Sequence, residues 1–168
     1  GQGVETVLAQ ICADALEIPY DQVDVVHGDT DVVPEGMGLF GSRATSLGGA
    51  AVAEAAAALR SRIAERVAAL TGAGQEVLAF TDEGVVQGDE VVGYPALLEG
   101  DETELSEEAR FRSTEMSFPY GVHVAAVEID TETGAVDVAR YGVAYDVGRA
   151  INPRLVEGQI EGGFAQGL

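Results

Sequence analysis

The sequence predicts an α+β fold, a fragment of a larger domain in which mixed, mainly antiparallel strands pack with long helices. Apolar residues recur every three or four positions near both ends of the chain and in a long run between them, which is the helical period. The best strand segments follow one another directly and are joined by tight turns, which favours antiparallel neighbours. Glycine is frequent, 22 of 168 residues, but lies scattered in turns rather than in a repeat.

The helical period is found in four segments. Residues 4–18 form the first predicted helix, which Pro19 ends. An alanine-rich run at 45–70 has one apolar stripe and predicts the longest helix. Small residues at its start would let another backbone approach closely. We expect a short helix near 95–98 and a final helix that begins at Leu155.

Strand signals lie between these helices. Residues 23–30 predict a short strand, and 31–43 predict a loop rich in glycine. Two or three short strands are expected within 75–93. The clearest hairpin joins 121–130 to 135–148 through the turn "TETG", because alternating apolar residues flank a turn that ends in glycine.

The chain is interpreted as one domain piece, residues 1–168, with two halves at 1–74 and 75–168. Each half contains a glycine-rich turn that leads into a helix. The sequence starts with glycine and stops inside an apolar helix-like pattern, so we expect a fragment of a longer polypeptide.

Charge and composition exclude several classes of function. The formal net charge is −20, and such a surface repels phosphate backbones, which argues against a nucleic-acid partner. No apolar run is long enough to span a bilayer, so no membrane partner is expected. Cys12 is a lone cysteine in an apolar helical run and is interpreted as core filler. A reducing, cytoplasmic location is expected, and no Cys/His cluster has the spacing of metal ligands.

The first stretch with chemical meaning is "GQG" at residues 1–3. Glycine before a helix lets a ligand reach the backbone, and the free N–H groups of the first turn suit an anion or an acceptor-rich ring. The glutamine adds donors and an acceptor without charge. The alternative is a plain helix entry with a solvated glutamine.

The second stretch is "GLFGSRATSLGG" at residues 38–49. It combines glycines, hydroxyl groups and Arg43 at a helix start, where Thr45 or Ser46 could act as the N-cap. These features suit a phosphate group. Neither a P-loop nor a G-x-G-x-x-G motif is present. The alternative is a capped helix with an exposed arginine.

The third stretch, "YDVGRAINPRLVEGQIEGG" at 145–163, places glycines on one helix, where each costs roughly 1 kcal/mol against alanine. They indicate either helix packing or a closely bound cofactor. In the preceding hairpin, His123 is interpreted as a packed or exposed strand residue rather than a ligand. Glu128 and Asp130 are interpreted as a solvated strand face rather than a carboxylate pair.

Together these stretches resemble the molybdenum-cofactor-binding domain of the xanthine oxidase family, with the large subunits of carbon monoxide dehydrogenase-like and aldehyde-oxidising enzymes closest in character. The resemblance covers residues 1–168 and is weakest over 72–115. It rests on four ordered stretches: "GQGVETVLAQICADALEIP", "VHGDTDVVPEGMGLFGSRATSLGGAAV", "VEIDTETGAVDVARY" and "DVGRAINPRLVEGQIEGGFAQGL".

The resemblance implies a molybdenum-bearing molybdopterin (pyranopterin dithiolene), in bacterial members as the cytosine dinucleotide. It implies no metal ligand in this chain and no catalytic residue, because the family's catalytic glutamate lies beyond residue 168. Phe40 and Gly41 would lie beside the molybdenum and the substrate pocket. The implied cofactor-binding residues are Gly1, Gln2, Gly3, Phe40, Gly41, Ser42, Arg43, Ala44, Thr45 and Gln159.

The implied parent enzyme transfers water-derived oxygen to CO, an aldehyde or an N-heterocycle. Its implied partners are the rest of the large subunit, iron–sulfur and flavin subunits or domains, and a small-molecule substrate. This piece alone is expected to be inactive and free of cofactor. The alternative is a non-catalytic binding or assembly module without cofactor, against which Gln2, Arg43 and Gln159 argue. A plain acidic interaction domain would leave the glycine placement unexplained.

Overall fold

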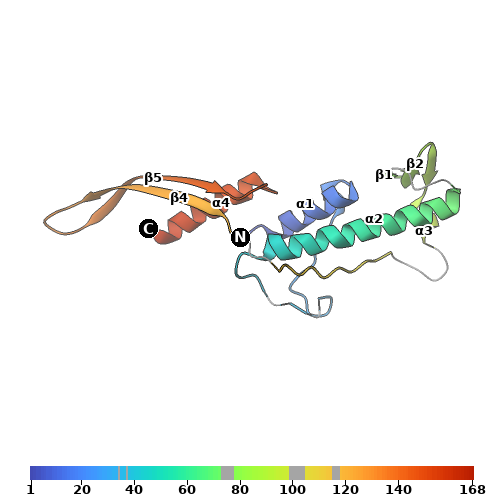
Figure 1. The fold of residues 1–168 in the computed structure, drawn as a ribbon, viewed down its shortest axis with the longest axis horizontal. Coiled ribbons are helices and arrows are strands. Elements are labelled where there is room, and N and C mark those ends of the chain that lie inside the picture. The colour runs from blue at the N-terminus through green and yellow to red at the C-terminus, as the bar shows by residue number, and fades with distance from the viewer. Residues whose placement is uncertain (34, 37, 73–77, 99–104, 115–117) are drawn as a thin grey trace.

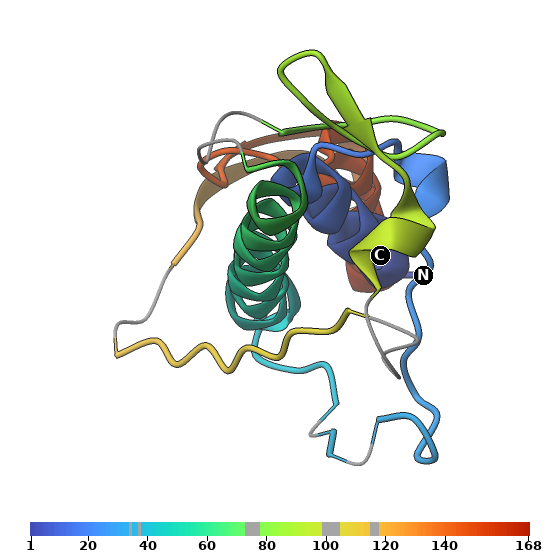
Figure 2. The same cartoon turned by 90° about the vertical axis from the view of Figure 1, so that its right-hand side faces the viewer.

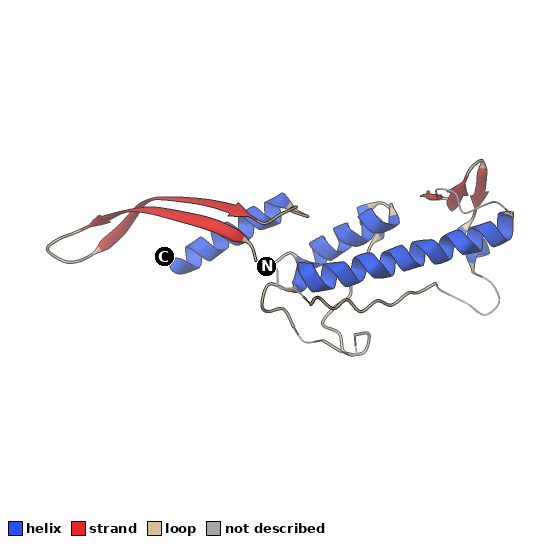
Figure 3. Cartoon of the chain, in the orientation of Figure 1, coloured by secondary structure: helices blue, strands red, loops and turns tan. Residues whose placement is uncertain are grey.

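Helices and two separate antiparallel sheets build an elongated α+β structure, which confirms the expected fold class (Figures 1 and 3). The chain is described by a computed structural model that covers residues 1–33, 35–36, 38–72, 78–98, 105–114 and 118–168. In chain order the elements are α1 (Val4–Leu16), η1 (Tyr20–Gln22), η2 (Ala44–Gly49), α2 (Ala50–Thr71), β1 (Leu78–Phe80), β2 (Val85–Gln87), β3 (Glu90–Val92), α3 (Tyr94–Leu97), β4 (Tyr120–Ile129), β5 (Val136–Asp146) and α4 (Pro153–Gly167).

Helices α1 and α2 lie side by side, as Figure 2 shows. The small residues at the start of the long helix allow this approach, as expected. A Cβ atom built on Gly49 would lie 2.7 Å from Cδ1 of Ile11, so a larger residue there would have to displace the end of the Ile11 side chain. The contact partner is a side chain of α1 rather than its backbone. Ala9, Ala13 and Ala56 are buried along this contact.

Two details of the helix ends differ from the expectation. Helix α1 ends at Leu16 because Glu17 adopts a left-handed conformation with φ 59°, before Pro19 is reached. The prediction that Thr45 or Ser46 caps the long helix is wrong. A π-helical turn, η2, precedes α2, and neither element has a side-chain cap at its start. Both hydroxyl residues therefore lie within a helical turn rather than before it.

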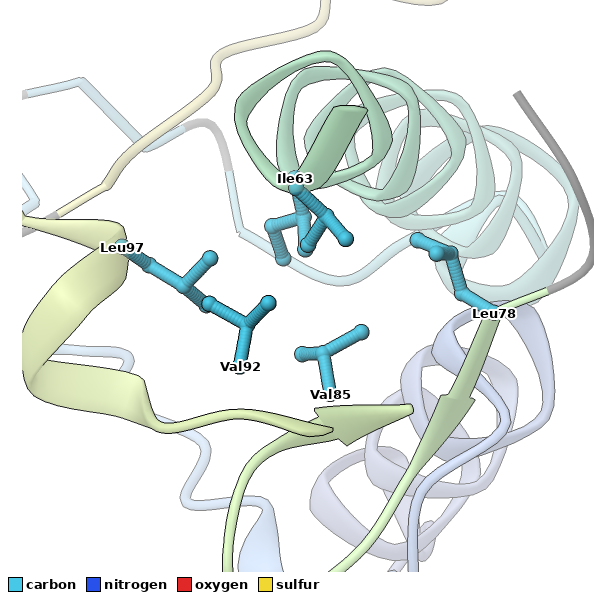
Figure 4. Close-up of a cluster of buried hydrophobic side chains, with 6 residues drawn as sticks. Ile63, Leu78, Val85, Val92 and Leu97 are labelled. Carbon is cyan, nitrogen blue, oxygen red and sulfur yellow. The ribbon is translucent and has the colours of Figure 1, made fainter. Parts of the chain in front are cut away.

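The hydrophobic core lies between the second half of α2, the three-stranded sheet and α3 (Figure 4). The strand order is β1-β2-β3, and each neighbouring pair is antiparallel. Each of these strands has only three residues, and its inward side chains pack on the apolar stripe of α2. This packing explains the alternation of apolar and polar residues from which the strands are predicted. The core side chains are Ile63, Val67, Leu78, Val85, Val92 and Leu97.

Arg60 ties three elements together beside this core. Its guanidinium donates to the backbone oxygen of Leu16 (2.7 Å) at the end of α1 and to that of Leu78 (2.9 Å) in β1, and it pairs with Glu17 at 2.9 Å. Carbonyls at a helix C-terminus have no partner within the helix, and a cation there also interacts favourably with the helix dipole. Arg60 thus fixes α1 and the small sheet on α2.

The strand expected at residues 23–30 is wrong. Residues 23–27 have no regular secondary structure, although Val23 has the extended dihedrals φ −112° and ψ 115°. Alternating valines make the segment extended, but no neighbouring strand pairs with it among the described residues. A strand needs a partner for its backbone N–H and C=O groups, which periodicity alone does not reveal.

The long hairpin β4–β5 extends away from α1 and α2, and α4 lies beside it (Figure 1). Tyr120 pairs with Asp146, and an irregularity between Ala126 and Val127 shifts the register. At the tip, the backbone N–H groups of Thr133 and Glu132 donate to Asp130 and lower its pKa. Every residue of both strands is exposed, as is much of α4, so this half has no core of its own among the described residues.

None of the helices that the structure describes combines the length and the apolar character needed to cross a bilayer.

Replacement of Arg60 by alanine is expected to lower the free energy of unfolding by about 2 kcal/mol, because two backbone carbonyls lose a charged donor. Urea denaturation followed by circular dichroism measures this change. Glu65→Ala on the exposed side of the same helix serves as the control and should stay within about 0.5 kcal/mol of the parent. Equal effects from the two variants would contradict the role of Arg60.

Cys12 lies half-buried on α1, and burial raises the pKa of its thiol. Only the thiolate reacts with alkylating agents, and a raised pKa leaves less thiolate at neutral pH. We therefore expect alkylation of Cys12 by iodoacetamide at pH 7.5 to be slow in the folded chain and to accelerate in urea. Mass spectrometry of timed samples tests this. Equal rates in the two conditions would show that the thiol is accessible and unperturbed.

Candidate cofactor-binding site

A groove of about 1180 Å³ lies where the two halves of the chain meet. This volume lies somewhat above the usual range for small-molecule sites, which is roughly 300–1,000 Å³. Its walls come from the start of α1, the loop before η2, the β4–β5 hairpin, the segment after β5 and one side of α4. Stretches from both ends of the chain therefore share one site.

The first wall is the entry of α1. Gln2 is exposed and lines the groove together with Val4. Gly3 caps the helix with φ 70°, and a Cβ atom there would lie 2.5 Å from Cδ1 of Leu155 in α4. Glycine suits this left-handed turn, and it leaves room for the Leu155 side chain. No side chain caps α1, which leaves its first N–H groups available to a ligand.

The second wall is the loop at residues 38–45. Ser42 has φ 54°, a left-handed conformation that costs a non-glycine residue about 1 kcal/mol or more and is often found at functional sites. Arg43 folds back over its own loop. Its guanidinium carbon lies 3.9 Å from the ring centroid of Phe40, and it donates to the backbone oxygen of Gly38 at 2.9 Å. Arg43 thus rigidifies the loop and still lines the groove.

The third wall is α4, which Asn152 positions. The side-chain oxygen of Asn152 accepts from the backbone N–H of Leu155 (3.1 Å) and caps the helix, while its amide donates to Gln10 of α1 (3.0 Å). One side chain therefore starts α4 and ties it to the N-terminal helix. Gln159, one turn further, is exposed and faces the same groove as Gln2.

Three helix starts converge on this groove: those of α1, of η2 with α2, and of α4. The starts of α1 and η2 have no side-chain cap and present unpaired backbone N–H groups, whereas Asn152 occupies the N–H of Leu155 at the start of α4. Each helix start carries a partial positive charge of about half an elementary charge. Together they favour an anionic ligand. They do so in a chain whose formal net charge is −20.

The fourth wall is aromatic and belongs to the hairpin. His123 of β4 lies between the hydroxyl groups of two β5 tyrosines, Tyr141 and Tyr145. The Tyr141 ring lies 4.0 Å, between centroids, from Phe164 of α4. All four residues line the groove. His123 is exposed, which agrees with its interpretation as a strand residue, but its hydrogen bonds place it in the site.

The structure brings together most of the predicted cofactor-binding residues. Gly1 and Gly3 do not line the groove, and Gly3 instead seats Leu155 of α4 as described. No group of three or more metal-ligating side chains is found in the part of the chain that the structure describes. The predicted residues that line the groove are Gln2, Phe40, Gly41, Ser42, Arg43, Ala44, Thr45 and Gln159.

A family model described as the molybdopterin cofactor-binding domain matches residues 1–168. The chain belongs to this family of molybdenum hydroxylase domains. The family is that of xanthine oxidase, carbon monoxide dehydrogenase and their relatives.

Relatives of this domain family share about a third of the sequence. The chain is 34% identical to subunit gamma of the 6-hydroxypseudooxynicotine dehydrogenase complex of Paenarthrobacter nicotinovorans, over 100% of the chain and 23% of that protein. It is 33% identical to the carbon monoxide dehydrogenase large chain of Hydrogenophaga pseudoflava, over 99% of the chain and 22% of that protein. The chain therefore spans less than a quarter of the length of these relatives.

A solved structure of the family has the same fold. Reconstituted CO dehydrogenase from Oligotropha carboxidovorans matches 97% of this chain and 22% of its own with a TM-score of 0.77 at 30% identity. The antiparallel hairpin and the helices around the groove are thus part of a known molybdenum hydroxylase architecture.

The segment 146–152 was missed as part of the site. It connects β5 to α4 and lines the groove throughout, with Arg149 as its cation. Asp146 accepts from the backbone N–H of Gly148 at 2.9 Å and shapes the turn. The stretch "DVGRAINP" belongs to the segment 145–163 that the sequence analysis singles out, but none of its residues is among the predicted cofactor-binding residues. Its aspartate, glycine and asparagine are turn and cap formers, and this signal could have indicated a loop at a ligand site.

Asn152→Ala is expected to destabilise α4 by about 1 kcal/mol through loss of the cap, and further through loss of the Gln10 contact. Hydrogen exchange of the α4 amides measures this directly. Asn152→Asp is the matched control, because its carboxylate still caps the helix and the Gln10 amide can turn to donate to it. Faster exchange in the alanine variant only is the expected result, and equal exchange in all three proteins would contradict it.

Proposed function

We propose that this chain holds the molybdopterin cofactor, in its cytosine dinucleotide form, for a molybdenum hydroxylase of which residues 1–168 are a fragment. The observation that carries the proposal is the convergence of three helix starts and two exposed amides, Gln2 and Gln159, on one groove. A pyrophosphate needs N–H donors and positive potential, and a pterin ring needs donors and acceptors without charge. The groove offers both.

The residues of this chain act by binding and orientation. The amides of Gln2 and Gln159 donate to and accept from the pterin ring. Ser42 and Thr45 supply hydroxyl groups, and the backbone N–H groups from Gly41 onward meet the phosphates. Phe40 and Gly41 border the molybdenum side. Gly1 and Gly3 shape the loop that presents Gln2, as the contact of Gly3 with α4 supports.

When bound, the cofactor supplies molybdenum for hydroxylation of a small molecule with oxygen from water, and electrons leave through iron–sulfur and flavin partners. Relatives of the chain include a nicotine 6-hydroxylase large subunit, a probable hypoxanthine oxidase, a probable aldehyde oxidase and a carbon monoxide dehydrogenase large chain. A CO, aldehyde or N-heterocycle substrate is therefore proposed. The catalytic glutamate and the substrate loop are assigned to the rest of the large subunit.

Substitution of either glutamine, Gln2→Ala or Gln159→Ala, is expected to lower the cofactor content of the complete polypeptide. Loss of two neutral hydrogen bonds corresponds to about tenfold weaker binding. Molybdenum is measured by elemental analysis and pterin by fluorescence after oxidation. Gln166→Ala is the matched control, because Gln166 lies on α4 without lining the groove and should retain full loading. Full loading in all three variants would contradict the assignment of the Gln2 and Gln159 amides to cofactor binding.

Residues 1–168 alone are expected to contain no stoichiometric molybdenum and to reduce no dye with CO, an aldehyde or an N-heterocycle, because the rest of the site is lacking. Metal analysis and a dye-reduction assay of the purified piece test this, and turnover would overturn it. The alternative, a module without cofactor, predicts that even the complete polypeptide from its native host lacks pterin.

A further inference from the structure

The aromatic wall of the groove contains a hydrogen-bonded cluster to which the proposed function gives no role. His123 stands between two tyrosines of the neighbouring strand. Its Nε2 atom is 2.7 Å from the hydroxyl oxygen of Tyr145, and its Nδ1 atom contacts the hydroxyl group of Tyr141. The register of the hairpin explains this, because residue 123 pairs with 143 and therefore lies between 141 and 145 on one face.

The protonation state of His123 decides how many tyrosine O–H groups in the cluster are free to donate to another partner. A neutral imidazole has one N–H donor and one acceptor nitrogen. With a tyrosine at each nitrogen, one hydroxyl donates to the ring and the other accepts from it. The accepting tyrosine keeps its own O–H proton free for another partner. When His123 is protonated both nitrogens donate, and both tyrosine O–H groups become free donors.

These free O–H groups belong to side chains that line the groove. The charged residues that line it, among those the structure describes, are Arg43, Asp146 and Arg149. Arg43 is engaged by its own loop, and α4 contributes uncharged residues to this wall. An anion at the aromatic wall would therefore contact the tyrosine O–H groups, with Arg149 as the other cation of the groove, and it would favour the charged form of the imidazole behind them.

We propose that His123, Tyr141 and Tyr145 form a proton-coupled subsite for a phosphate diester of the ligand in the groove. The tyrosines contact the phosphate oxygens, and His123 is a positioning residue that turns both hydroxyls toward the ligand when it is protonated. Binding of the phosphate and protonation of His123 then strengthen each other, as linkage requires. The proposal rests on the proposed function, because it places the phosphates of a nucleotide-type cofactor in this groove.

The test uses the complete polypeptide in its cofactor-free form and cytidine diphosphocholine as the probe. The probe is a pyrophosphate diester whose charge does not change between pH 5.5 and 8, so a pH-dependent affinity reports on the protein. Isothermal titration calorimetry is run across this range in two buffers of different ionisation enthalpy. We expect about tenfold tighter binding at pH 5.5 than at pH 8, because acid favours the imidazolium form, in which both ring nitrogens donate and both tyrosine O–H groups are free. We also expect net proton uptake on binding.

His123→Gln is the decisive variant. A glutamine amide donates on one side and accepts on the other, so it imitates the neutral imidazole and preserves the fold of the hairpin. Its affinity should equal that of the parent at pH 8 and lose the pH dependence. Tyr141→Phe and Tyr145→Phe should each weaken binding at pH 5.5 by about fivefold, the equivalent of one hydrogen bond. Cytidine without phosphate should show no pH-dependent binding.

His27→Gln is the matched control, because His27 pairs with Glu5 at 2.8 Å and does not line the groove. It should leave the pH dependence unchanged. An unchanged pH dependence in His123→Gln, a pH-independent affinity of the parent, or failure of the probe to bind would each overturn the subsite. Loss of pterin in the Gln2 and Gln159 variants would still support the proposed function, so the two failures are distinguishable.

Discussion

The groove depends on one side chain, Asn152. Its oxygen starts α4 by capping the backbone N–H of Leu155, and its amide holds the Gln10 side chain 142 positions away in the sequence. The close seating of Leu155 on Gly3 reinforces this junction. Because α4 and the hairpin have little burial of their own, these contacts set where the second half of the site lies relative to α1. Without them the two glutamines would not share a site.

The convergence of helix starts on the groove explains how an acidic chain can offer a site to an anion. A chain with 29 acidic and 9 basic residues offers few cations to an anionic ligand. Backbone dipoles supply what side chains do not, because each helix start brings N–H groups that need no counter-charge of their own. Arg43 contributes mainly by fixing the shape of its loop over Phe40. The surface can thus stay acidic while the groove suits phosphate.

Sequence reasoning predicted the fold where local chemistry decides it. Periodicity located the helices, the three short strands and the hairpin, and the motifs indicated Gln2, the loop at 40–45 and Gln159 among the residues that line the groove. It failed at residues 23–30, where an extended run lacks a strand to pair with, and at Thr45, where a π-helical turn takes the place of a capped start. It also missed the link between His123 and its tyrosines. Strand partners and cross-strand neighbours are set by tertiary structure, which a single sequence does not display.

The exposed β4–β5 ribbon has a consequence for how residues 1–168 behave on their own. Both of its edges lack a neighbouring strand among the described residues, and apolar side chains such as Val124 and Ile129 are exposed on it. Open edges of this kind template pairing between identical molecules. We therefore expect a dimer or larger species of the isolated chain at high concentration to form by edge-to-edge pairing of these ribbons rather than as a physiological assembly. Charged substitutions along the ribbon would be the first means of keeping the chain monodisperse.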